Sequence, residues 1–473
     1  MKYLHPLLIL TLFSVLLADC TVSDESRELE LNNARPLIKN VVLISIDTLR
    51  PDHLGTYGYL RETSPNIDKL AKTSWIFEAA YAPIPRTGPS VASMLTGMFT
   101  QRIREWSVPD EMDTVAELLA EQGWTTVAAV DNANLSEELG YGQGFQVYRE
   151  TWEEKDNEID RTHLITETAV EHLEHFAETD ERFFMWLHYV NPHGPYTPPE
   201  TFAAKFMNDA YFDDAVRLPQ TPRYIGGIRP SVYVEGEHRL AYYIAQYDGE
   251  IAFTDNEIGK VLRVLENRVA LDNTLIIITS DHGEGLGEGD VYFKHGPAIS
   301  EPHVRVPLIV TAPNKEPTPK RITTPVGLID ITPTILEMVG IQDPRFDSDR
   351  AAYPLAGQSL ESTHRGEIPN HRPYIFFASR RYWGIRSGDW KLISRTGNSN
   401  KSSEDPFQLY NLASDPEEFF NLYANEPARA NDLLQLLRSR RSIQRTATRN
   451  PSERYDALSK EALDNLRTLG YIQ

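Results

Sequence analysis

The chain is short of cysteine, of basic residues and of long apolar runs. Its 473 residues include one cysteine, Cys20, which excludes an intramolecular disulfide and any cysteine-rich zinc site. Lysine and arginine number 47 against 68 aspartate and glutamate residues, so the formal net charge is −21. Because no long basic cluster offsets this charge, we expect no nucleic-acid partner. A negative protein that acts on an anionic substrate needs a local positive charge, which a metal ion would supply.

An apolar stretch lies near the start of the chain. Residues 7–17 are apolar except for Thr11 and Ser14, and a lysine stands at position 2. This stretch is too short for a transmembrane helix, which needs about 20 apolar residues. A charged start followed by a short apolar stretch is typical of an export signal. We therefore expect residues 1–20 to be an export signal and residues 21–37 to be a polar, acidic tether.

Cys20 stands at the end of this signal. A cysteine in this place resembles a bacterial lipoprotein signal, in which the cysteine carries the lipid. Asp19 departs from that pattern, because the residue before the cysteine is usually small, and an ordinary secretory signal is the alternative. We expect an exported protein of the periplasm or cell envelope that meets the membrane only through a lipid anchor on Cys20.

Strand patterns and helical patterns alternate after residue 40. Short β-branched apolar runs predict buried strands, at residues 41–46, 124–130, 183–187, 275–278 and 306–310. Helical patterns lie between them, at residues 114–122, 162–176 and 239–267. This alternation predicts an α/β fold with a mostly parallel central sheet flanked by helices. Short runs after residue 373, separated by turn residues, predict a smaller antiparallel sheet.

Polar clusters follow three of the predicted strands. Asp47 comes after the first strand, His193 lies shortly after another, and Asp281 is followed by His282 at the end of a third. In open α/β sheets the carboxyl ends of the strands form the ligand site, so we expect these side chains to meet at one edge. Carboxylate and imidazole groups together bind divalent cations. A single aspartate in such a place often only caps a helix, so the prediction depends on the coincidence of all three clusters.

Thr87 opens a further segment of interest. Residues 87–97 predict a turn that runs into a short helix, and Pro89 suits the first turn of that helix. A hydroxyl at this point would lie beside the free N–H groups of a helix N-terminus, which favour an anion. The alternative is that Thr87 only caps the helix.

These segments together resemble the sulfatase family of the alkaline-phosphatase-like superfamily. They occur in the family's order and span nearly the whole chain after the signal, at residues 40–58 (NVVLISIDTLRPDHLGTYG), 87–97 (TGPSVASMLTG), 188–199 (HYVNPHGPYTPP), 247–258 (YDGEIAFTDNEI), 280–284 (SDHGE), 305–309 (RVPLI) and 408–422 (QLYNLASDPEEFFNL). The resemblance implies a sulfatase-like catalytic domain at 38–345, a C-terminal subdomain at 346–430 and a helical tail at 431–473.

The resemblance also implies roles for individual residues. Asp47, Asp281 and His282 fall on metal-ligand positions, and this ligand set suits one divalent cation, Ca, Mg, Mn or Zn. His193 matches a histidine that contacts the ester, and His295 resembles a further basic residue on the substrate side. Lys294 is the alternative for that task, and Thr48 replaces a second carboxylate or amide ligand.

Three departures from the family pattern modify the expected chemistry. Thr87 stands where sulfatases have a cysteine or serine that becomes formylglycine, Val91 replaces an arginine, and residues 131–134 lack the lysine and histidine of that region. Relatives with a serine or threonine nucleophile act mainly on phosphate monoesters or diesters, or transfer phospho-groups.

We therefore expect a metal-dependent hydrolase of sulfuric or phosphoric esters, with a small-molecule, glycan or lipid substrate. Thr87 would be the nucleophile, and His193 or His295 would protonate the leaving oxygen. Two alternatives stay open at this point: a phospho-group transferase acting on envelope glycans or lipids, and a catalytically degenerate binding protein with a sulfatase fold.

The N-terminal interpretation has a direct test. If Cys20 carries a lipid, cells that express the full chain should incorporate a fatty-acid analogue into it, and Cys20→Ser should remove the label. The control is Ser23→Ala, a change in the neighbouring tether that leaves the cysteine in place. A labelled Cys20→Ser protein would contradict the anchor.

Overall fold

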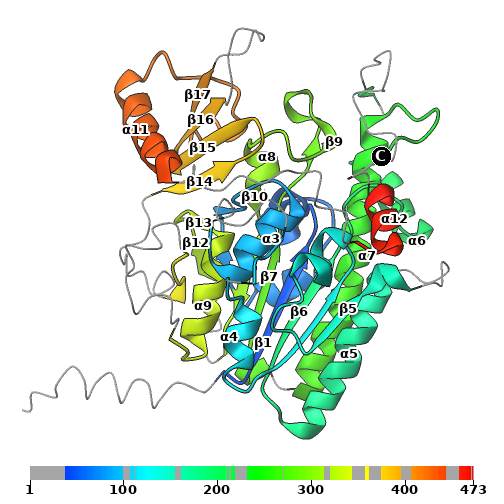
Figure 1. Ribbon diagram of the computed structural model, residues 1–473. Coiled ribbons are helices and arrows are strands. Elements are labelled where there is room, and N and C mark those ends of the chain that lie inside the picture. The colour runs from blue at the N-terminus through cyan, green and yellow to red at the C-terminus, as the bar shows by residue number, and fades with distance from the viewer. Residues whose placement is uncertain are drawn as a thin grey trace, which may run out of the picture. The chain divides into compact units, whose positions relative to one another are not determined.

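The computed structural model describes most of the chain after residue 37 (Figure 1). The described residues are 38–99, 107–110, 112–154, 161–208, 210–211, 215–218, 232–269, 271–313, 320–342, 357–361, 374–395, 406–443, 458–469 and 471. They belong to one compact unit that begins at Ile38. The predicted export signal and tether, with Cys20, lie outside the described residues.

An eight-stranded sheet forms the centre of this unit. In spatial order its strands are β12 (Lys320–Ile322), β2 (Trp75–Phe77), β11 (Leu308–Thr311), β7 (Thr274–Ser280), β1 (Asn40–Ile46), β6 (Phe183–Tyr189), β4 (Thr125–Val130) and β5 (Val147–Glu150). The strands from β7 to β5 run parallel, and β11 is antiparallel to both of its neighbours. The predicted mostly parallel α/β sheet is therefore confirmed.

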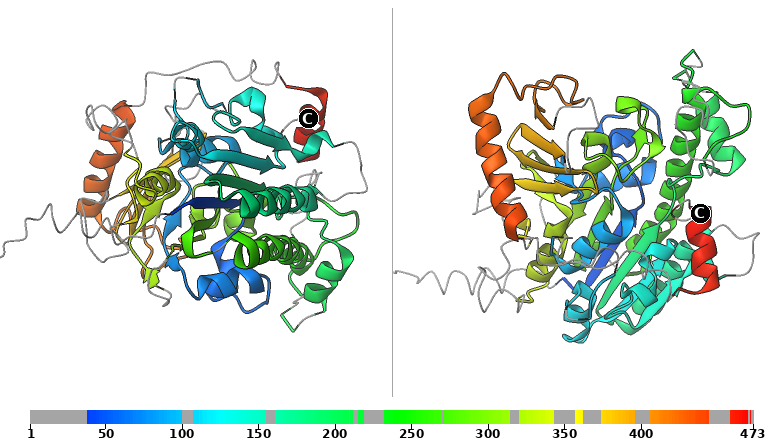
Figure 2. Two further views of the ribbon diagram at one scale, coloured as in Figure 1. Left: turned by 90° about the horizontal axis from the view of Figure 1, so that it is seen from below. Right: turned by 45° about the horizontal axis from the view of Figure 1, so that its top comes forward.

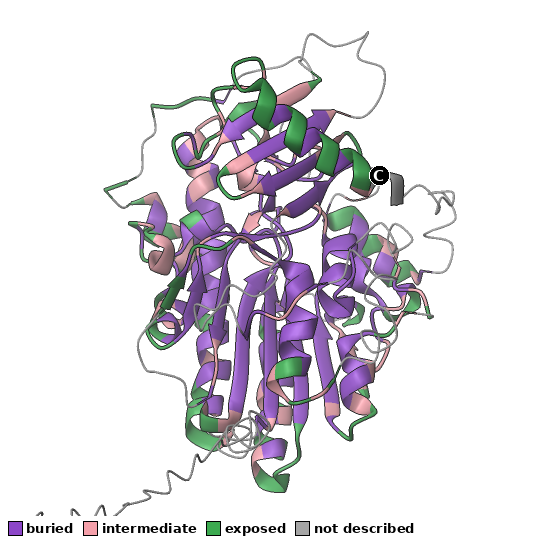
Figure 3. Cartoon of the chain, turned by 90° about the vertical axis from the view of Figure 1, so that its left-hand side faces the viewer, coloured by how far each residue is buried: buried purple, intermediate pink, exposed green. Residues whose placement is uncertain are grey.

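Helices cover both faces of this sheet, which explains why its strands are continuously apolar. Along β1, Val41 and Leu43 pack into one core and Val42 and Ile44 into the other, because successive side chains point to opposite faces. The first core includes α3 (Thr87–Thr96), α4 (Val115–Ala120) and α9 (Ile331–Met338). The second includes α2 (Pro65–Ala71), α5 (Arg161–Thr179) and α7 (Leu240–Val264). Figure 2 shows these layers, and Figure 3 shows that the central strands are buried.

A second, antiparallel sheet follows in the sequence, as predicted. Its strands are β14 (Ile375–Ala378), β15 (Tyr382–Ser387), β16 (Trp390–Arg395) and β17 (Phe407–Asn411), paired in sequence order. Helix α11 (Pro427–Ile443) packs on this sheet, whereas α12 (Lys460–Thr468) lies against η4 (Ala133–Leu135) and η6 (Thr151–Glu153) beside the large sheet (Figure 1). The residues of the expected tail thus lie in two separate places.

Short elements complete the described part of the fold. They include a three-stranded sheet of β3 (Ala80–Tyr81), β10 (Arg305–Val306) and β13 (Val326–Gly327), a hairpin of β8 (Gly285–Leu286) and β9 (Tyr292–Lys294), and the helices α6 (Glu200–Met207) and α8 (Glu301–Val304). No helix in the described ranges has both the length and the apolar character that a membrane span requires.

A buried ion cluster joins the small sheet to the rest of the unit. Lys391 on β16 is fully buried, and its Nζ lies 2.8 Å from Glu301 Oε1 and 2.9 Å from Glu418 Oε1. Burial by itself lowers the pKa of Lys391, but the two carboxylates outweigh this effect and hold the pKa above its ordinary value. Since Glu301 begins α8, this charge cluster fixes the small sheet against the segment that leads into β10.

Replacing this lysine should be costly. In Lys391→Met the carboxylates of Glu301 and Glu418 lose their cation, and we expect the free energy of unfolding to fall by about 3–5 kcal/mol in a urea titration. The matched control is Lys69→Met, which removes an exposed pair with Glu266 and should cost less than about 1 kcal/mol. Equal costs for the two variants would contradict the structural role of the cluster.

Candidate active site

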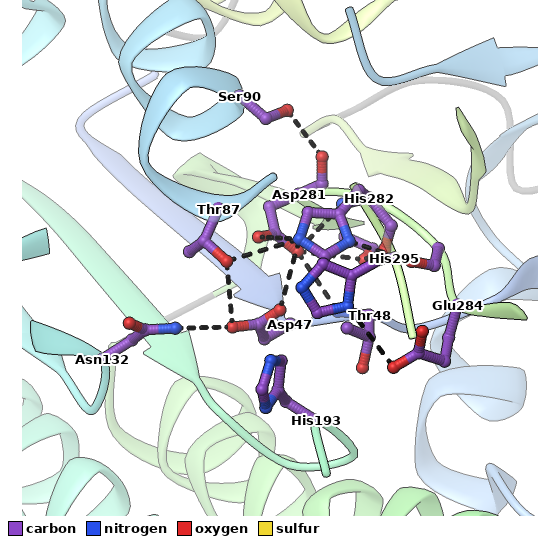
Figure 4. Close-up of polar contacts among 12 residues, drawn as sticks. Asp47, Thr48, Thr87, Ser90, Asn132, His193, Asp281, His282, Glu284 and His295 are labelled. Atoms are coloured by element: carbon purple, nitrogen blue, oxygen red, sulfur yellow. Dashed lines mark hydrogen bonds and ion pairs between the residues drawn. The ribbon is translucent and has the colours of Figure 1, made fainter. Parts of the chain in front are cut away.

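The site residues lie at the carboxyl ends of four adjacent strands (Figure 4). Asp47 directly follows β1, and Asp281 directly follows β7. Because Ile46 pairs with Ser280 across these parallel strands, the two aspartates leave the sheet side by side. His188 lies near the end of β6, the other neighbour of β1, and Asn132 follows β4 at one residue's distance.

Asp47 and Asp281 form a buried acidic pair, with no exposed surface. Burial raises the pKa of the Asp47 carboxyl well above its ordinary value, and the neighbouring Asp281 carboxylate raises it further. Asp47 Oδ1 and Asp281 Oδ2 make no hydrogen bond to any described residue. Two adjacent carboxylates in the interior repel each other, so this arrangement calls for a positive charge between them.

Two histidines present ring nitrogens to the acidic pair. His282 Nδ1 donates to the carbonyl oxygen of Gly283 at 2.9 Å, so Nε2 faces the carboxylates, 3.3 Å from Asp281 Oδ2 and 3.7 Å from Asp47 Oδ1. His188 Nδ1 is bonded to Ser45 Oγ at 2.8 Å, and its Nε2 lies 3.8 Å from Asp47 Oδ2. Burial lowers the pKa of His188 to about 4, so this ring is neutral at pH 7 and can act as a ligand.

These residues fit a divalent cation. One ligand atom each from Asp47, His188 and Asp281 lies within 4.8 Å of the others, and all three residues are buried. Such ions usually bind carboxylate oxygens and neutral imidazole rings. In such a ring one nitrogen binds the ion, and a hydrogen bond fixes the other nitrogen. His282, which lies just after β7, faces the same carboxylates.

Thr48 contributes through its backbone. Its φ of 59° lies in the left-handed region, which is rare for a β-branched residue and costs about 1–3 kcal/mol. This conformation directs the Thr48 N–H to Asp281 Oδ1 at 3.2 Å, while its carbonyl oxygen accepts from Tyr247 at 2.7 Å. The hydroxyl of Thr48 makes no hydrogen bond to a described residue. The backbone N–H of Thr48 therefore orients Asp281, and the Thr48 side chain is not needed for this.

Thr87 is the first residue of α3 and is fully buried. Its Oγ1 lies 3.3 Å from Asp47 Oδ2 and 3.3 Å from His282 Nε2 (Figure 4). The N-cap position belongs to Arg86 instead. The hydroxyl therefore faces the acidic pair, at the helix end where free N–H groups favour an anion.

His193 and His295 lie next to this centre. Their rings are 5.0 Å apart, and the His295 ring is 4.4 Å from that of His282. His193 Nδ1 donates to the carbonyl oxygen of Gly194 at 2.7 Å, and His295 Nδ1 lies 3.4 Å from Glu284 Oε2. Lys294 ends β9, where it pairs with Gly285 on β8, and no hydrogen bond or ion pair joins it to the described site residues.

Three residues of the site were not expected from the sequence. Asn132 donates from Nδ2 to Asp47 Oδ2 at 2.8 Å, and its place shortly after a strand was the available signal. His188 was detectable as a histidine inside an apolar strand run. Tyr471, whose hydroxyl lies 2.9 Å from Thr87 Oγ1, had no such signal, because its place depends on how a distant helix docks.

Fold and site together define an ester hydrolase of the alkaline-phosphatase-like class. A family model described as Sulfatase matches residues 39–341, and the chain belongs to this family. A second model, described as N-sulphoglucosamine sulphohydrolase, C-terminal, matches residues 289–445. The resemblance read from the motifs is thus confirmed, and so is the sulfatase-like ester hydrolase that it implied.

Known proteins of similar sequence and structure agree with this assignment. The sulfatase YidJ of Escherichia coli K12 is 28% identical over 81% of this chain and 82% of its own length. N-acetylglucosamine-6-O-sulfatase of Bacteroides thetaiotaomicron is 23% identical over 84% of this chain and 85% of its own. The crystal structure of the phosphonate monoester hydrolase of Agrobacterium radiobacter superposes with a TM-score of 0.69, at 21% identity, over 86% of this chain and 96% of its own, which shows the shared fold.

Cation binding should be visible as stabilisation. Adding a divalent cation to chelator-treated protein should raise its melting temperature, since a ligand at 100 times its Kd adds about 2.7 kcal/mol to the folded state. The double variant Asp47→Asn, Asp281→Asn should lose this response. Asp180→Asn, a change at an exposed carboxylate paired with Lys39, should keep it. A cation response of equal size in the double variant would contradict the site.

Proposed function

We propose that the protein hydrolyses sulfuric or phosphoric esters with Thr87 as the nucleophile, at a site that holds one divalent cation. One observation carries this proposal. The buried Thr87 hydroxyl lies within 3.3 Å of both Asp47 and His282, at the start of helix α3. A hydroxyl in this position combines an attacking atom, an acidic centre and an anion-favouring helix end.

The cation would be held by Asp47, Asp281 and His282, with His188 as a further ligand. When bound, it would lower the pKa of a contacting hydroxyl and polarise the oxygens of the ester. The chain keeps these ligands in position by hydrogen bonds: Asn132 holds Asp47 Oδ2, and Ser90 Oγ donates to the Asp281 carbonyl oxygen at 2.6 Å. Such supporting contacts are what fix ligand geometry in metal sites.

Residues of the chain would carry out the attack on the ester, the binding of its oxygens and the protonation of the leaving group. Thr87 Oγ gives its proton to Asp47 Oδ2, to which it donates at 3.3 Å, and attacks the phosphorus or sulfur atom. The first N–H groups of α3 attract the negative oxygens of the ester. His193 or His295 protonates the leaving oxygen as the ester bond breaks. Glu284 fixes the orientation of the His295 ring through its contact with Nδ1. Water then attacks the Thr87 ester and restores the hydroxyl.

Three departures from the sulfatase pattern favour a phosphoric over a sulfuric ester. Thr87 cannot become formylglycine, the group that replaces cysteine or serine in the resembling sulfatases. In addition, Asn132 provides a neutral amide at the strand end where those enzymes have charged residues, and Val91 on α3 is buried and apolar. We therefore place phosphate monoesters or diesters first among the substrates, so that the enzyme would act as a phosphodiesterase or phosphatase.

The expected location of the enzyme restricts the range of candidate substrates further. An exported protein, free or anchored through Cys20, would meet esters of envelope or environmental glycans and lipids. One of the relatives described above is named as an N-acetylglucosamine-6-O-sulfatase, which supports a glycan ester. A phospho-group transferase would differ only in the second step, where an acceptor alcohol replaces water.

Removing the hydroxyl tests the nucleophile. Thr87→Ala should lower kcat/KM on the best ester by about 10³-fold or more while cation binding stays intact. Thr87→Ser should keep partial activity, because its hydroxyl remains. The control is Thr96→Ala, the same chemical change at the other end of α3, which should leave turnover unchanged. Normal turnover in Thr87→Ala would refute the covalent mechanism.

A panel of esters tests the substrate class. Nitrophenyl phosphate, bis-nitrophenyl phosphate, nitrophenyl phenylphosphonate and nitrophenyl sulfate should be compared with and without added cations. We expect the phosphoric esters to be turned over fastest, and only when cation is present. A preference for the sulfate ester would contradict the argument from Thr87 and Asn132. Added glycerol that yields a phosphorylated product would favour the transferase.

A further inference from the structure

The segment around α12 brings a tyrosine into the catalytic centre. Tyr471 OH lies 2.9 Å from Thr87 Oγ1 and 3.4 Å from Asn132 Nδ2. Its ring stacks on His193 with a centroid distance of 5.3 Å and an interplanar angle of 22°, and lies 6.2 Å from the His295 ring. The region in front of Thr87 is bordered by Asn132, His193 and His295. We call this region the ester site.

The phenol and a substrate need the same space. For attack, the phosphorus or sulfur atom must approach Thr87 Oγ to about 3–3.5 Å before the bond forms. The other near neighbours of Thr87 Oγ1 are Asp47 and His282 on the acidic side. The phenol oxygen stands on the side of His193 and Asn132, where the ester would have to enter. Ester and Tyr471 therefore exclude each other.

The tyrosine is held in this place by a docked helix. Leu458, Ala462 and Leu466 are buried in the same core as α3 and α4, with exposed fractions of 8%, 1% and 0%. Asn465 is also buried, and its Oδ1 accepts the backbone N–H of Ala133 at 3.0 Å, next to Asn132. The N–H of Tyr471 bonds the Leu466 carbonyl oxygen at 2.9 Å, which turns the chain back toward the site. These buried side chains and hydrogen bonds therefore hold Tyr471 in its position.

We propose that Tyr471 is an internal occupant of the ester site that competes with the substrate, so that the enzyme binds its ester only when this tyrosine withdraws. The inference rests on the proposed function, since it assigns the ester to the space in front of Thr87. It adds a regulatory element: any partner or surface that draws the α12 segment away from η4 activates the enzyme.

Anion binding tests this without turnover. Inorganic phosphate and inorganic sulfate are titrated calorimetrically into the cation-loaded full chain, into Tyr471→Ala and into a chain ending at Leu469. If the docked state outnumbers the open state tenfold, the apparent affinity is reduced tenfold, so both variants should bind the preferred anion about tenfold more tightly. Tyr471→Phe keeps the stacked ring and loses the hydroxyl, and should gain less.

Two changes on α12 provide matched controls. Asn465→Ala removes the hydrogen bond to Ala133 outside the ester site, and should tighten anion binding in the same direction as Tyr471→Ala. Arg467→Ala, on the exposed side of the helix, where it pairs with Asp464, should leave the affinity unchanged. Melting temperatures confirm that each variant is folded.

Unchanged anion affinity in Tyr471→Ala would overturn the proposal. Weaker affinity would overturn it too, because it would make Tyr471 a donor to the bound anion. These outcomes are separate from the fate of the proposed function. Tighter anion binding without turnover of any ester would support the internal occupant and refute the hydrolase, whereas Thr87-dependent turnover with unchanged anion affinity would do the reverse.

Discussion

The repulsion between two buried carboxylates, Asp47 and Asp281, is the constraint that the site depends on. Both side chains are fully buried, and their unbonded oxygens face a common point. Side by side in the interior, they need compensation from hydrogen bonds and from a positive charge. Asn132 and the backbone of Thr48 supply hydrogen bonds, and the strain at Thr48 is part of the cost of that arrangement. The histidines His188 and His282 direct ring nitrogens to the same carboxylates.

The parallel sheet makes this constraint possible. Parallel strands end at the same edge, so residues separated by more than two hundred positions, such as Asp47 and Asp281, leave adjacent strands together. Helices on both faces keep water away from the strands and hold the strand ends in place. Helix α3 then brings Thr87 to the carboxylates from the first of the two cores. Sheet order thus brings together the residues on which the chemistry of the site depends.

The departures from the usual sulfatase pattern share one consequence, which is fewer fixed positive groups at the site. A threonine replaces the formylglycine precursor, and the neutral Asn132 bonds Asp47 and contacts Tyr471 at the strand end where charged residues were expected. With fewer fixed positive groups of its own, the proposed hydrolase would depend more on a cation and on the N-terminus of α3 to attract an anion. Tyr471 closes the same space from a segment more than three hundred residues away in the chain.

The sequence alone determined the fold class and most of the centre. Continuous β-branched runs predicted the strands, because strands buried on both faces must be apolar, and polar residues at their ends predicted Asp47, Asp281 and His282 as neighbours. Thr87 was predicted from its place at the start of a helix and from the resemblance to sulfatases. His188 and Asn132 carried weaker signals, since one is hidden in a strand and the other replaces an expected charge. The tertiary structure alone decided the orientation of the Thr48 backbone and the place of Tyr471. These depend on backbone strain and helix docking, which arise from contacts between distant segments and leave no local pattern.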